Sequence, residues 1–458
     1  MKEQKINGKR ETLLSFFWNM SSKVVAYLLL LVLGNLYIAS EYGKAVFVIS
    51  IYYIIVMVST LGMPNAAVPW IVKKKDFSSV FKILFVISFL AALGTILITM
   101  LVVSYRAYNK DLIYMMIFIA LAIILYWANN VSISFLIAKK NYSFISFVGV
   151  ASVLITLGMA VILKRFFGLG IIISYFSGYL FSAVVMSWRA RHDFLRVIRD
   201  LKINFSSFKT YIKDGAVVSL VTLSFFFMSW ADSVILGLFT NLESVSKYSI
   251  SITFSNIVIL IPFTLSMFVI TRISEVKNKI KSQNILKRVM RVSYYFSFII
   301  ALLISSYLSL FIKIFFPKYQ GIEIYAIILM VGALFYSSYF IVYNYFVAKA
   351  KVSQNFLPIV LASLINIILG IALIFKFGVY GVCAATAIAH FTAFILLTRG
   401  FLKARKIIIM SILPFVLLLA YYSSYFGIII AIAFCIILIK LKIIEIEDLK
   451  IIKNAIKK

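Results

Sequence analysis

Two side chains of opposite charge interrupt long apolar stretches of this sequence and are the first candidates for chemistry. Lys23 stands in an apolar stretch over residues 12–37, and Asp232 stands in another over residues 212–240. About 20 apolar residues are enough to cross the hydrocarbon core of a membrane as a helix. Ionised groups at that depth are costly, so they usually face a cavity or a partner. We therefore expect function to concentrate around Lys23 and Asp232.

Lys23 is predicted to lie near the middle of its helix. At a rise of about 1.5 Å per residue it is about 15 Å beyond Leu13, halfway through a core of about 30 Å. Asn19 and Ser22 belong to the small and polar stripe of the same helix. Three interpretations stay open: an interior ion pair with Asp232, contact with an anionic group of a carried ligand, or bonds to water or helix-break carbonyls.

Other polar residues and prolines inside apolar stretches complete the candidate set. Asn256, like Asp232, is a candidate polar or gate residue of a central cavity. Pro64 and Pro262 are expected to kink two helices at corresponding places in the two halves of the chain. Hydrogen bonds between helices are the more common use of mid-helix amides, and His390 is interpreted first as a hydrogen-bonded core residue. We predict no metal ligands.

The composition requires a membrane around these residues. Of 458 residues, 63% are hydrophobic and only 13% are charged, with a mean hydropathy of +1.06. The formal net charge of +31 is explained by basic loops on one face of a membrane, so we expect no nucleic-acid partner. Neither an HExxH run nor a GxxxxGK[ST] run occurs, and the predicted outer loops are short. We therefore predict no catalytic residues, no enzymatic activity and no cofactor.

The predicted fold is an all-α polytopic membrane protein with about 14 transmembrane helices. Apolar stretches long enough to span are found near residues 12–37, 44–71, 80–104, 111–138, 143–164, 169–188, 212–240, 246–271, 290–315, 322–348, 354–375, 379–399, 407–423 and 425–441.

The distribution of Lys and Arg orients these helices. Of the 46 basic residues, 36 fall in the termini and in every second loop, and nine fall in the alternate loops. Basic residues are retained on the cytoplasmic side, so both termini are predicted to be cytoplasmic, which requires an even number of spans.

An internal repeat divides the helices into two lobes. Ile137–Lys139 recurs as Val347–Lys349, and Phe167-Gly168 recurs as Phe377-Gly378 at the same offset of 210. Six spans per repeat predict two six-helix lobes inserted in the same orientation, with a central cavity between them and two extra C-terminal helices. The expected segments are an N-lobe over 1–188, a basic cytoplasmic linker over 189–211, a C-lobe over 212–399, two further spans within 400–441 and a basic tail over 442–458.

Several short motifs, in their order and spacing, resemble one family of membrane proteins. They are Ile38–Lys44, Ser59–Ala66, Asp214–Ala216, Trp230–Gly237 with its Asp before Ile-Leu-Gly, and the segment from Phe315–Tyr319 through Asn366 to Lys376–Thr386. Together they are similar to the Wzx-type polysaccharide flippases of the multidrug/oligosaccharidyl-lipid/polysaccharide exporter superfamily.

The resemblance implies a carrier of lipid-linked oligosaccharides. The expected substrate is an undecaprenyl-pyrophosphate-linked repeat unit, turned across the bacterial plasma membrane for O-antigen and lipopolysaccharide, capsule or exopolysaccharide synthesis. It also implies a pyrophosphate contact for Lys23, membrane lipids as surroundings, and a polysaccharide polymerase and chain-length regulator as candidate partners. A proton or a sodium ion is the candidate coupling ion. The alternatives are a lipid II flippase, a cation-coupled multidrug exporter of the same superfamily and, less favoured, a membrane polysaccharide polymerase.

Overall fold

Long helices make up almost all of the described chain, and the apolar sequence explains why. In lipid the backbone N–H and C=O groups find no water, so a spanning segment satisfies them within its own helix. The computed structural model describes residues 25–422 except 26, 61–70, 72–77, 107–109, 140, 200–203, 277 and 350. Over these residues all regular elements are helices, and nine helices are long and apolar enough to cross a membrane. The predicted all-α polytopic fold is confirmed.

The chain divides into two compact units, each described by itself. Unit 1 comprises residues 1–237 and 241–246, and unit 2 comprises residues 238–240 and 247–458. The predicted lobe boundaries at 188 and 212 stay a prediction. The count of fourteen spans does too, because the predicted spans over 12–37 and 425–441 lie partly or wholly outside the described residues.

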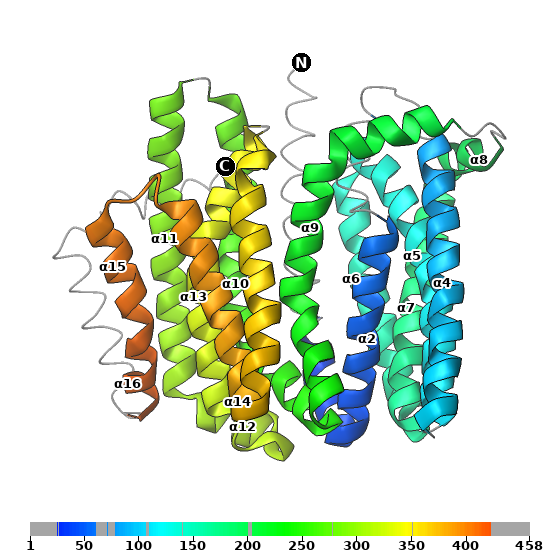
Figure 1. The fold of residues 1–458 in the computed structure, drawn as a ribbon, viewed down its shortest axis with the longest axis horizontal. Helices are drawn as coiled ribbons and strands as arrows, with labels where there is room; N and C mark the ends of the chain where they lie inside the picture. Colours follow the sequence, from blue (N-terminus) through cyan, green and yellow to red (C-terminus); the bar gives the residue numbers. More distant parts are fainter. Residues whose placement is uncertain are drawn as a thin grey trace. The chain divides into compact units, whose positions relative to one another are not determined.

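Unit 1 is a bundle composed mostly of membrane-length helices (Figure 1). Its elements are a short apolar helix over Tyr27–Leu36, α2 (Ala39–Thr60), α4 (Ser78–Arg106), α5 (Lys110–Ala138), α6 (Tyr142–Ile162), a 3-10 turn at Lys164–Phe166, α7 (Phe167–Arg189), α8 (Arg191–Arg199) and most of α9 (Phe205–Phe239).

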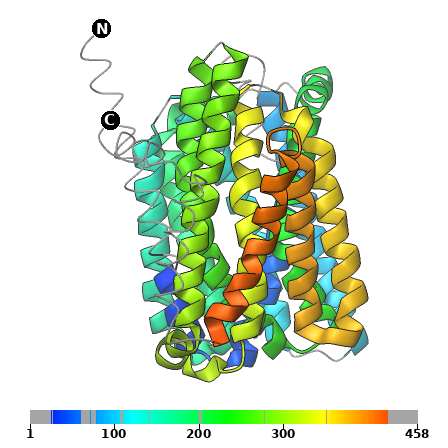
Figure 2. The ribbon, with the colours of Figure 1, turned by 90° about the vertical axis from the view of Figure 1, so that its left-hand side faces the viewer.

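Unit 2 contains the remaining helices. They are α10 (Leu242–Glu275, which begins in unit 1), α11 (Lys279–Ser306), α12 (Leu308–Phe315), α13 (Glu323–Ala348), α14 (Phe356–Thr398), α15 (Ala404–Ile412) and α16 (Val416–Tyr422), with 3-10 turns at Pro317–Tyr319, Val352–Asn355 and Leu413–Phe415. Figure 2 shows α15 and α16 crossing this unit obliquely. The Tyr294 hydroxyl of α11 donates a hydrogen bond to the Met410 carbonyl of α15 and ties the two helices together.

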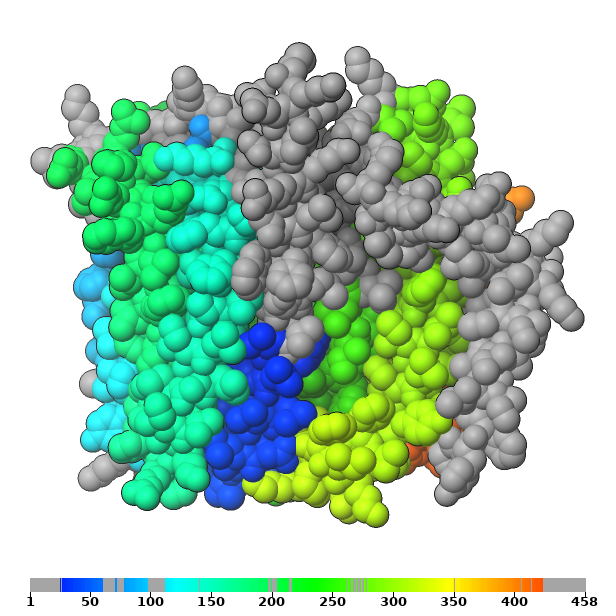
Figure 3. All heavy atoms as spheres, turned by 180° about the vertical axis from the view of Figure 1, so that it is seen from behind, coloured from blue at the N-terminus to red at the C-terminus, as the bar shows by residue number. Residues whose placement is uncertain are grey.

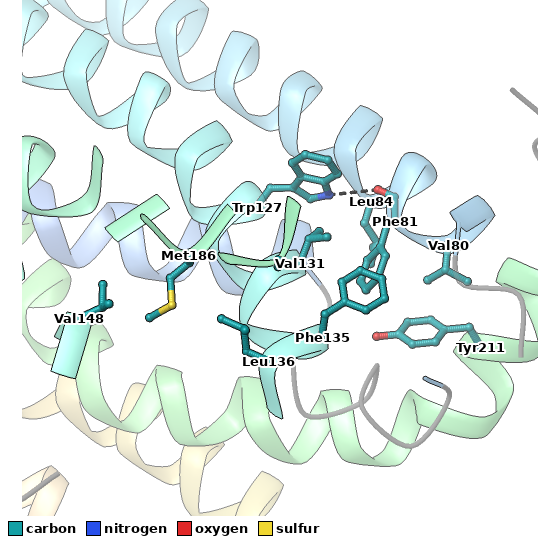
Figure 4. Close-up of a cluster of buried hydrophobic side chains, with 11 residues drawn as sticks. Val80, Phe81, Leu84, Trp127, Val131, Phe135, Leu136, Val148, Met186 and Tyr211 are labelled. Carbon is teal, nitrogen blue, oxygen red and sulfur yellow. Dashed lines mark hydrogen bonds between the residues drawn. The ribbon is translucent and has the colours of Figure 1, made fainter. Parts of the chain in front are cut away.

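A cluster of large apolar side chains fixes the helices of unit 1 around α5. Phe81 of α4 and Phe135 of α5 are in edge contact, and both are buried. The Trp127 indole donates to the Phe81 carbonyl at 3.0 Å (Figure 4), which satisfies its polar N–H in an apolar surrounding. Tyr211, near the beginning of α9, belongs to the same cluster. These contacts hold α4, α5 and the first turns of α9 in one unit.

Two helix–helix turns, one in each unit, share an unusual backbone conformation. Phe167 begins α7 with φ 50° and ψ −137°, and Gly378 kinks α14 with φ 54° and ψ −132°. Three residues later, Gly170 and Gly381 each approach a carbonyl oxygen of the preceding helix, at Leu163 and Leu373. The conformations therefore match at an offset of 211, so Phe167 occupies the position that Gly378 fills in the second turn.

Candidate functional site

Helix α9 carries the predicted acid and packs tightly against α2. A Cβ atom at Gly43 of α2 would lie 1.7 Å from the carbonyl oxygen of Leu242, at the beginning of α10. A Cβ atom at Gly237 of α9 would lie 2.2 Å from the ring of Phe47. At Gly43 a side chain would collide with backbone, so glycine is required there, whereas at Gly237 a side chain would force the Phe47 ring to move. The contacts run in opposite directions along the chain, so α2 and α9 are antiparallel.

An aromatic stack continues this contact toward the middle of the two helices. The rings of Tyr53 on α2 and Trp230 on α9 are stacked, with centroids 4.3 Å apart and planes at 20°. Asp232 follows Trp230 by two residues and is fully buried. It therefore lies at the level of α2 between Phe47 and Tyr53. The structure places the predicted acid inside the helix packing of unit 1, away from the lipid-facing surface.

Four tyrosines from three helices gather next to this stack. The hydroxyls of Tyr53 on α2 and Tyr179 on α7 share a hydrogen bond of 2.7 Å. Tyr52 packs edge-on against Tyr126 of α5 and against Tyr179. A cavity of about 10 Å³ between these helices has room for about one water molecule. Neutral hydroxyls can donate and accept hydrogen bonds at membrane depth without the desolvation cost of a full charge.

The tyrosine cluster was not predicted from the sequence. The signal was present: Tyr52 and Tyr53 are adjacent in an apolar run, and Tyr175 and Tyr179 are four residues apart on another. The spacing of four places Tyr175 and Tyr179 on one helix face, whereas Tyr52 and Tyr53 point in different directions around theirs. Nothing local indicates that these side chains meet tyrosines from other helices.

Asparagine side chains inside the helices are expected to join neighbouring helices, and some of them do. Ser182 of α7 donates to the Asn129 side-chain oxygen of α5 at 3.2 Å, which joins two helices. Asn130 and Asn344 instead donate to the carbonyls of Tyr126 and Phe340 four residues earlier in their own helices.

The remaining predicted site residues are distributed differently. Lys23, Asn19, Ser22 and Pro64 lie outside the described residues, so their roles stay predictions. Asn256 is half-buried on α10, and Pro262 is buried inside the same helix. Both belong to unit 2, whereas Asp232 belongs to unit 1.

His390 of α14 is hydrogen-bonded, as its interpretation as a core residue requires. Its Nδ1 atom lies 2.9 Å from the Tyr339 hydroxyl of α13, and Tyr336 packs edge-on against the imidazole. Within the part of the chain that the structure describes, no group of three or more His, Cys, Asp or Glu side chains could hold a metal ion.

Comparison with known proteins relates this arrangement to membrane carriers. The sequence profile of a family described as polysaccharide biosynthesis proteins matches residues 32–319. No curated protein sequence matches the chain. The structure is similar to that of the lipid II flippase MurJ in an inward closed conformation, with a TM-score of 0.73, 17% identity, and coverage of 95% of this chain and 99% of that one.

Two multidrug transporter structures share the fold less closely. An inward-facing multidrug resistance transporter of the MATE family, in the MOP superfamily, gives a TM-score of 0.62 at 13% identity, covering 87% of this chain and 95% of that one. An outward-facing structure of such a transporter gives 0.52 at 15% identity, covering 88% and 96%. At these identities the likeness concerns the fold.

Proposed function

The chain belongs to the polysaccharide biosynthesis protein family, and on that premise we propose that it flips undecaprenyl-pyrophosphate-linked oligosaccharide repeat units across the bacterial plasma membrane. The substrate would turn from the inner to the outer leaflet by alternating access. The product would feed the synthesis of a surface polysaccharide such as O-antigen, capsule or exopolysaccharide. Both termini would be cytoplasmic, and a polymerase and a chain-length regulator would act on the exported units.

The observation that carries this proposal is the family match over residues 32–319, which includes both α2 and α9. Fold similarity to a lipid II flippase over 95% of the chain supports a lipid-linked substrate. A fully buried acid and a cluster of neutral tyrosines in unit 1 are polar groups of the kind expected in a membrane carrier.

The chemistry of the substrate explains the role proposed for Lys23. A pyrophosphate carries at least two negative charges, and moving it into the membrane costs several kcal/mol or more without a cationic partner. Lys23 would supply that cation, and Asp232 would neutralise Lys23 when no substrate is bound. Asn19, Ser22 and Asn256 would add polar contacts, while Pro64 and Pro262 would let their helices bend.

The test is export of surface glycan by variants produced at equal levels. We expect Lys23→Ala to abolish export and Lys164→Ala, an exposed lysine in a predicted outer turn, to leave it unchanged. If Lys23 and Asp232 also pair, Asp232→Ala will impair export, the double variant will be less impaired than either single one, and exchanging the two residues will restore function. Normal export by Lys23→Ala would contradict the pyrophosphate contact.

A lipid II flippase is the second candidate, favoured by the TM-score of 0.73 to a structure of that kind. The two can be separated with purified protein in vesicles by following the flipping of lipid II and of an undecaprenyl-pyrophosphate oligosaccharide side by side. Flipping of lipid II alone would assign the second function. Efflux of a cationic drug would instead indicate a multidrug exporter, and a change in glycan chain length without a change in flipping would indicate a polymerase.

Dissipating one ion gradient at a time in the same vesicles would identify the coupling ion. Loss of flipping on collapse of the proton gradient would assign the proton, and loss on collapse of the sodium gradient would assign sodium.

A further inference from the structure

The short helix α8 presents arginines beside a membrane-spanning helix. It follows directly after α7, and Figure 1 shows it at the end of unit 1. Arg191, Arg196 and Arg199 are exposed on α8, and Arg189 is exposed at the last residue of α7. The face is predicted to be cytoplasmic, because it belongs to the side that carries most of the basic residues.

The choice of arginine in this segment is not explained by topology. Only twelve of the chain's 46 basic residues are arginine, yet residues 189–199 contain four arginines and no lysine. Lysine and arginine retain a loop in the cytoplasm equally well, whereas a planar guanidinium binds two oxygens of one phosphate group. The composition therefore points to phosphate recognition.

Two contacts fix α8 so that this face points outward. Asp193, the acid of the helix, accepts a hydrogen bond from Lys139, the residue after α5, in an ion pair. Phe194 is half-buried and lies 6.1 Å from the Trp127 ring between centroids. Because Lys139 engages the acid and Phe194 is held in the core, the arginines are positioned before any ligand arrives.

The outward face forms a shallow groove with both charged and apolar walls. The groove has a volume of about 400 Å³ and is lined by His192, Leu195, Arg196 and Arg199. His192, Arg196 and Arg199 share one side of the helix at i, i+4 and i+7. Leu195 is exposed beside them, so the groove offers cations for a phosphate and an apolar surface next to them.

Exposed aromatic residues precede and follow α8 along the chain. Trp188 is 71% exposed, and the Arg191 guanidinium lies 5.4 Å from its ring centroid. Phe205, at the beginning of α9, is 72% exposed. Tryptophan and other aromatic side chains favour the headgroup level of a membrane, and a basic amphipathic helix with such neighbours lies in that plane. A soluble polyanion would leave these apolar side chains in water.

We propose that α8 is a binding site for the phosphate of an anionic phospholipid headgroup. Arg196 and Arg199 hold the phosphodiester, Arg191 stays at the same level through its contact with Trp188, and Leu195 and Phe205 meet the upper part of the acyl chains. The site does not depend on which substrate the protein carries. Figure 3 shows the end of unit 1 that includes α8 standing free at the surface, in green at the upper left.

The test uses the purified full-length protein in detergent, with a fluorophore on Ser206→Cys, an exposed position next to Phe205 that does not line the groove. The native Cys383 is buried, and Cys435 is replaced by Ser. Titration with phosphatidylglycerol should give a saturable response, whereas phosphatidylcholine, whose phosphate is neutralised by its own choline cation, should give a much weaker one. The double variant R196Q/R199Q should bind phosphatidylglycerol about thirtyfold more weakly, because each arginine close to an anionic surface strengthens binding about fivefold.

The matched control removes the same charge from the opposite end of the bundle. Lys164 and Arg165 are exposed in the turn between α6 and α7, so K164Q/R165Q should bind phosphatidylglycerol within twofold of the parent protein. Thermal unfolding of each variant without lipid checks folding. If R196Q/R199Q unfolds, R196K/R199K replaces it, and this variant should bind more weakly than the parent although it keeps both charges.

Four results would overturn the proposal. The first is a response to phosphatidylcholine equal to that of phosphatidylglycerol, and the second is an equal loss of affinity in R196Q/R199Q and K164Q/R165Q. The third is full affinity in R196K/R199K, which would reduce the effect to diffuse charge attraction. The fourth is an equal response to inorganic phosphate, which would make the site one for free anions.

Discussion

Single residues carry strain or make contacts that their neighbours in the sequence do not reveal. Among the residues that the structure describes, Phe167 is the one non-glycine residue with positive φ. It begins α7 in a conformation that Gly378 adopts in the second repeat. Only glycine adopts this conformation without strain, because it has no Cβ atom. The first turn therefore keeps a phenylalanine at a cost that the packing around it must offset.

We predict that Phe167→Gly stabilises the protein. Relief of backbone strain, less the entropy that glycine loses on folding, should raise the free energy of unfolding by about 1 kcal/mol. The Phe167 side chain is 61% exposed, so little packing is lost. Thermal unfolding in detergent measures the effect. Phe377→Gly is the control: Phe377 is 50% exposed but precedes the strained position, so this variant should be destabilised. Equal shifts in both variants would contradict the interpretation.

Elements are held at their ends and at their crossings by contacts specific to each. The repeat-related residues Lys139 and Lys349 illustrate this. Lys139 makes an exposed ion pair with Asp193 of α8, whereas Lys349 donates to the carbonyls of Ile273 and Val276 at the end of α10, at 3.1 and 2.6 Å. The same position in two repeats thus anchors a surface helix in one and caps a spanning helix in the other.

We expect the two lysines to differ in their effect on stability. Lys349→Met removes a cation from the negative end of α10 and leaves carbonyls without this donor, which should cost about 1–2 kcal/mol. Lys139→Met breaks an ion pair whose lysine is 60% exposed, and such pairs contribute about 0–1 kcal/mol. Hydrogen exchange at the end of α10 should increase in Lys349→Met alone. Similar exchange in both variants would argue against the cap.

The packing of α2 against α9 and the beginning of α10 depends on the absence of two side chains. Gly43→Ala should be strongly destabilising, because its Cβ would meet the backbone oxygen of Leu242, which no side-chain rotation can move. Gly237→Ala should be milder, because the Phe47 ring can turn away. Gly149→Ala on α6 is the control: its Cβ meets nothing within 4 Å, and alanine favours a helix by about 1 kcal/mol. Yield and unfolding temperature measure the order, and a loss for Gly149→Ala as large as for Gly43→Ala would contradict it.

The whole molecule is organised by the membrane, which acts on charge and on backbone hydrogen bonds at once. Apolar stretches become helices because lipid offers the backbone no other partner, and basic loops stay on one side. The 36 basic residues in alternate loops and termini, against nine in the others, predict one orientation for the entire chain.

Cysteine labelling of intact cells tests this orientation. Both His192 and Arg165 are exposed, and they belong to opposite predicted sides. A membrane-impermeant thiol reagent should label Arg165→Cys and spare His192→Cys, while permeabilised cells should label both. The reverse pattern in intact cells would invert the predicted topology.

The prediction of the fold succeeded where the signal is local. The spans near 169–188 and 322–348, for example, correspond to α7 and α13 within a few residues, because an apolar run of that length has one stable conformation in lipid. Asp232 is predicted to lie at membrane depth and to face a cavity or pair with Lys23; the structure buries its side chain, and its role stays a prediction. Lys23 lies outside the described residues, so its partner stays a prediction.

The sequence by itself determined the class of fold, the predicted orientation and the positions where charge meets the membrane, since these depend on composition along a single segment. The tertiary structure alone decided which segments meet: Tyr53 with Tyr179, Gly43 with Leu242, and Asp193 with Lys139. It also changed the offset between the two repeats at this turn from 210 to 211, because Phe167 rather than Gly168 has the backbone conformation of Gly378. Lipid acts on each helix separately, whereas contacts between helices depend on shapes that come together only when several helices pack.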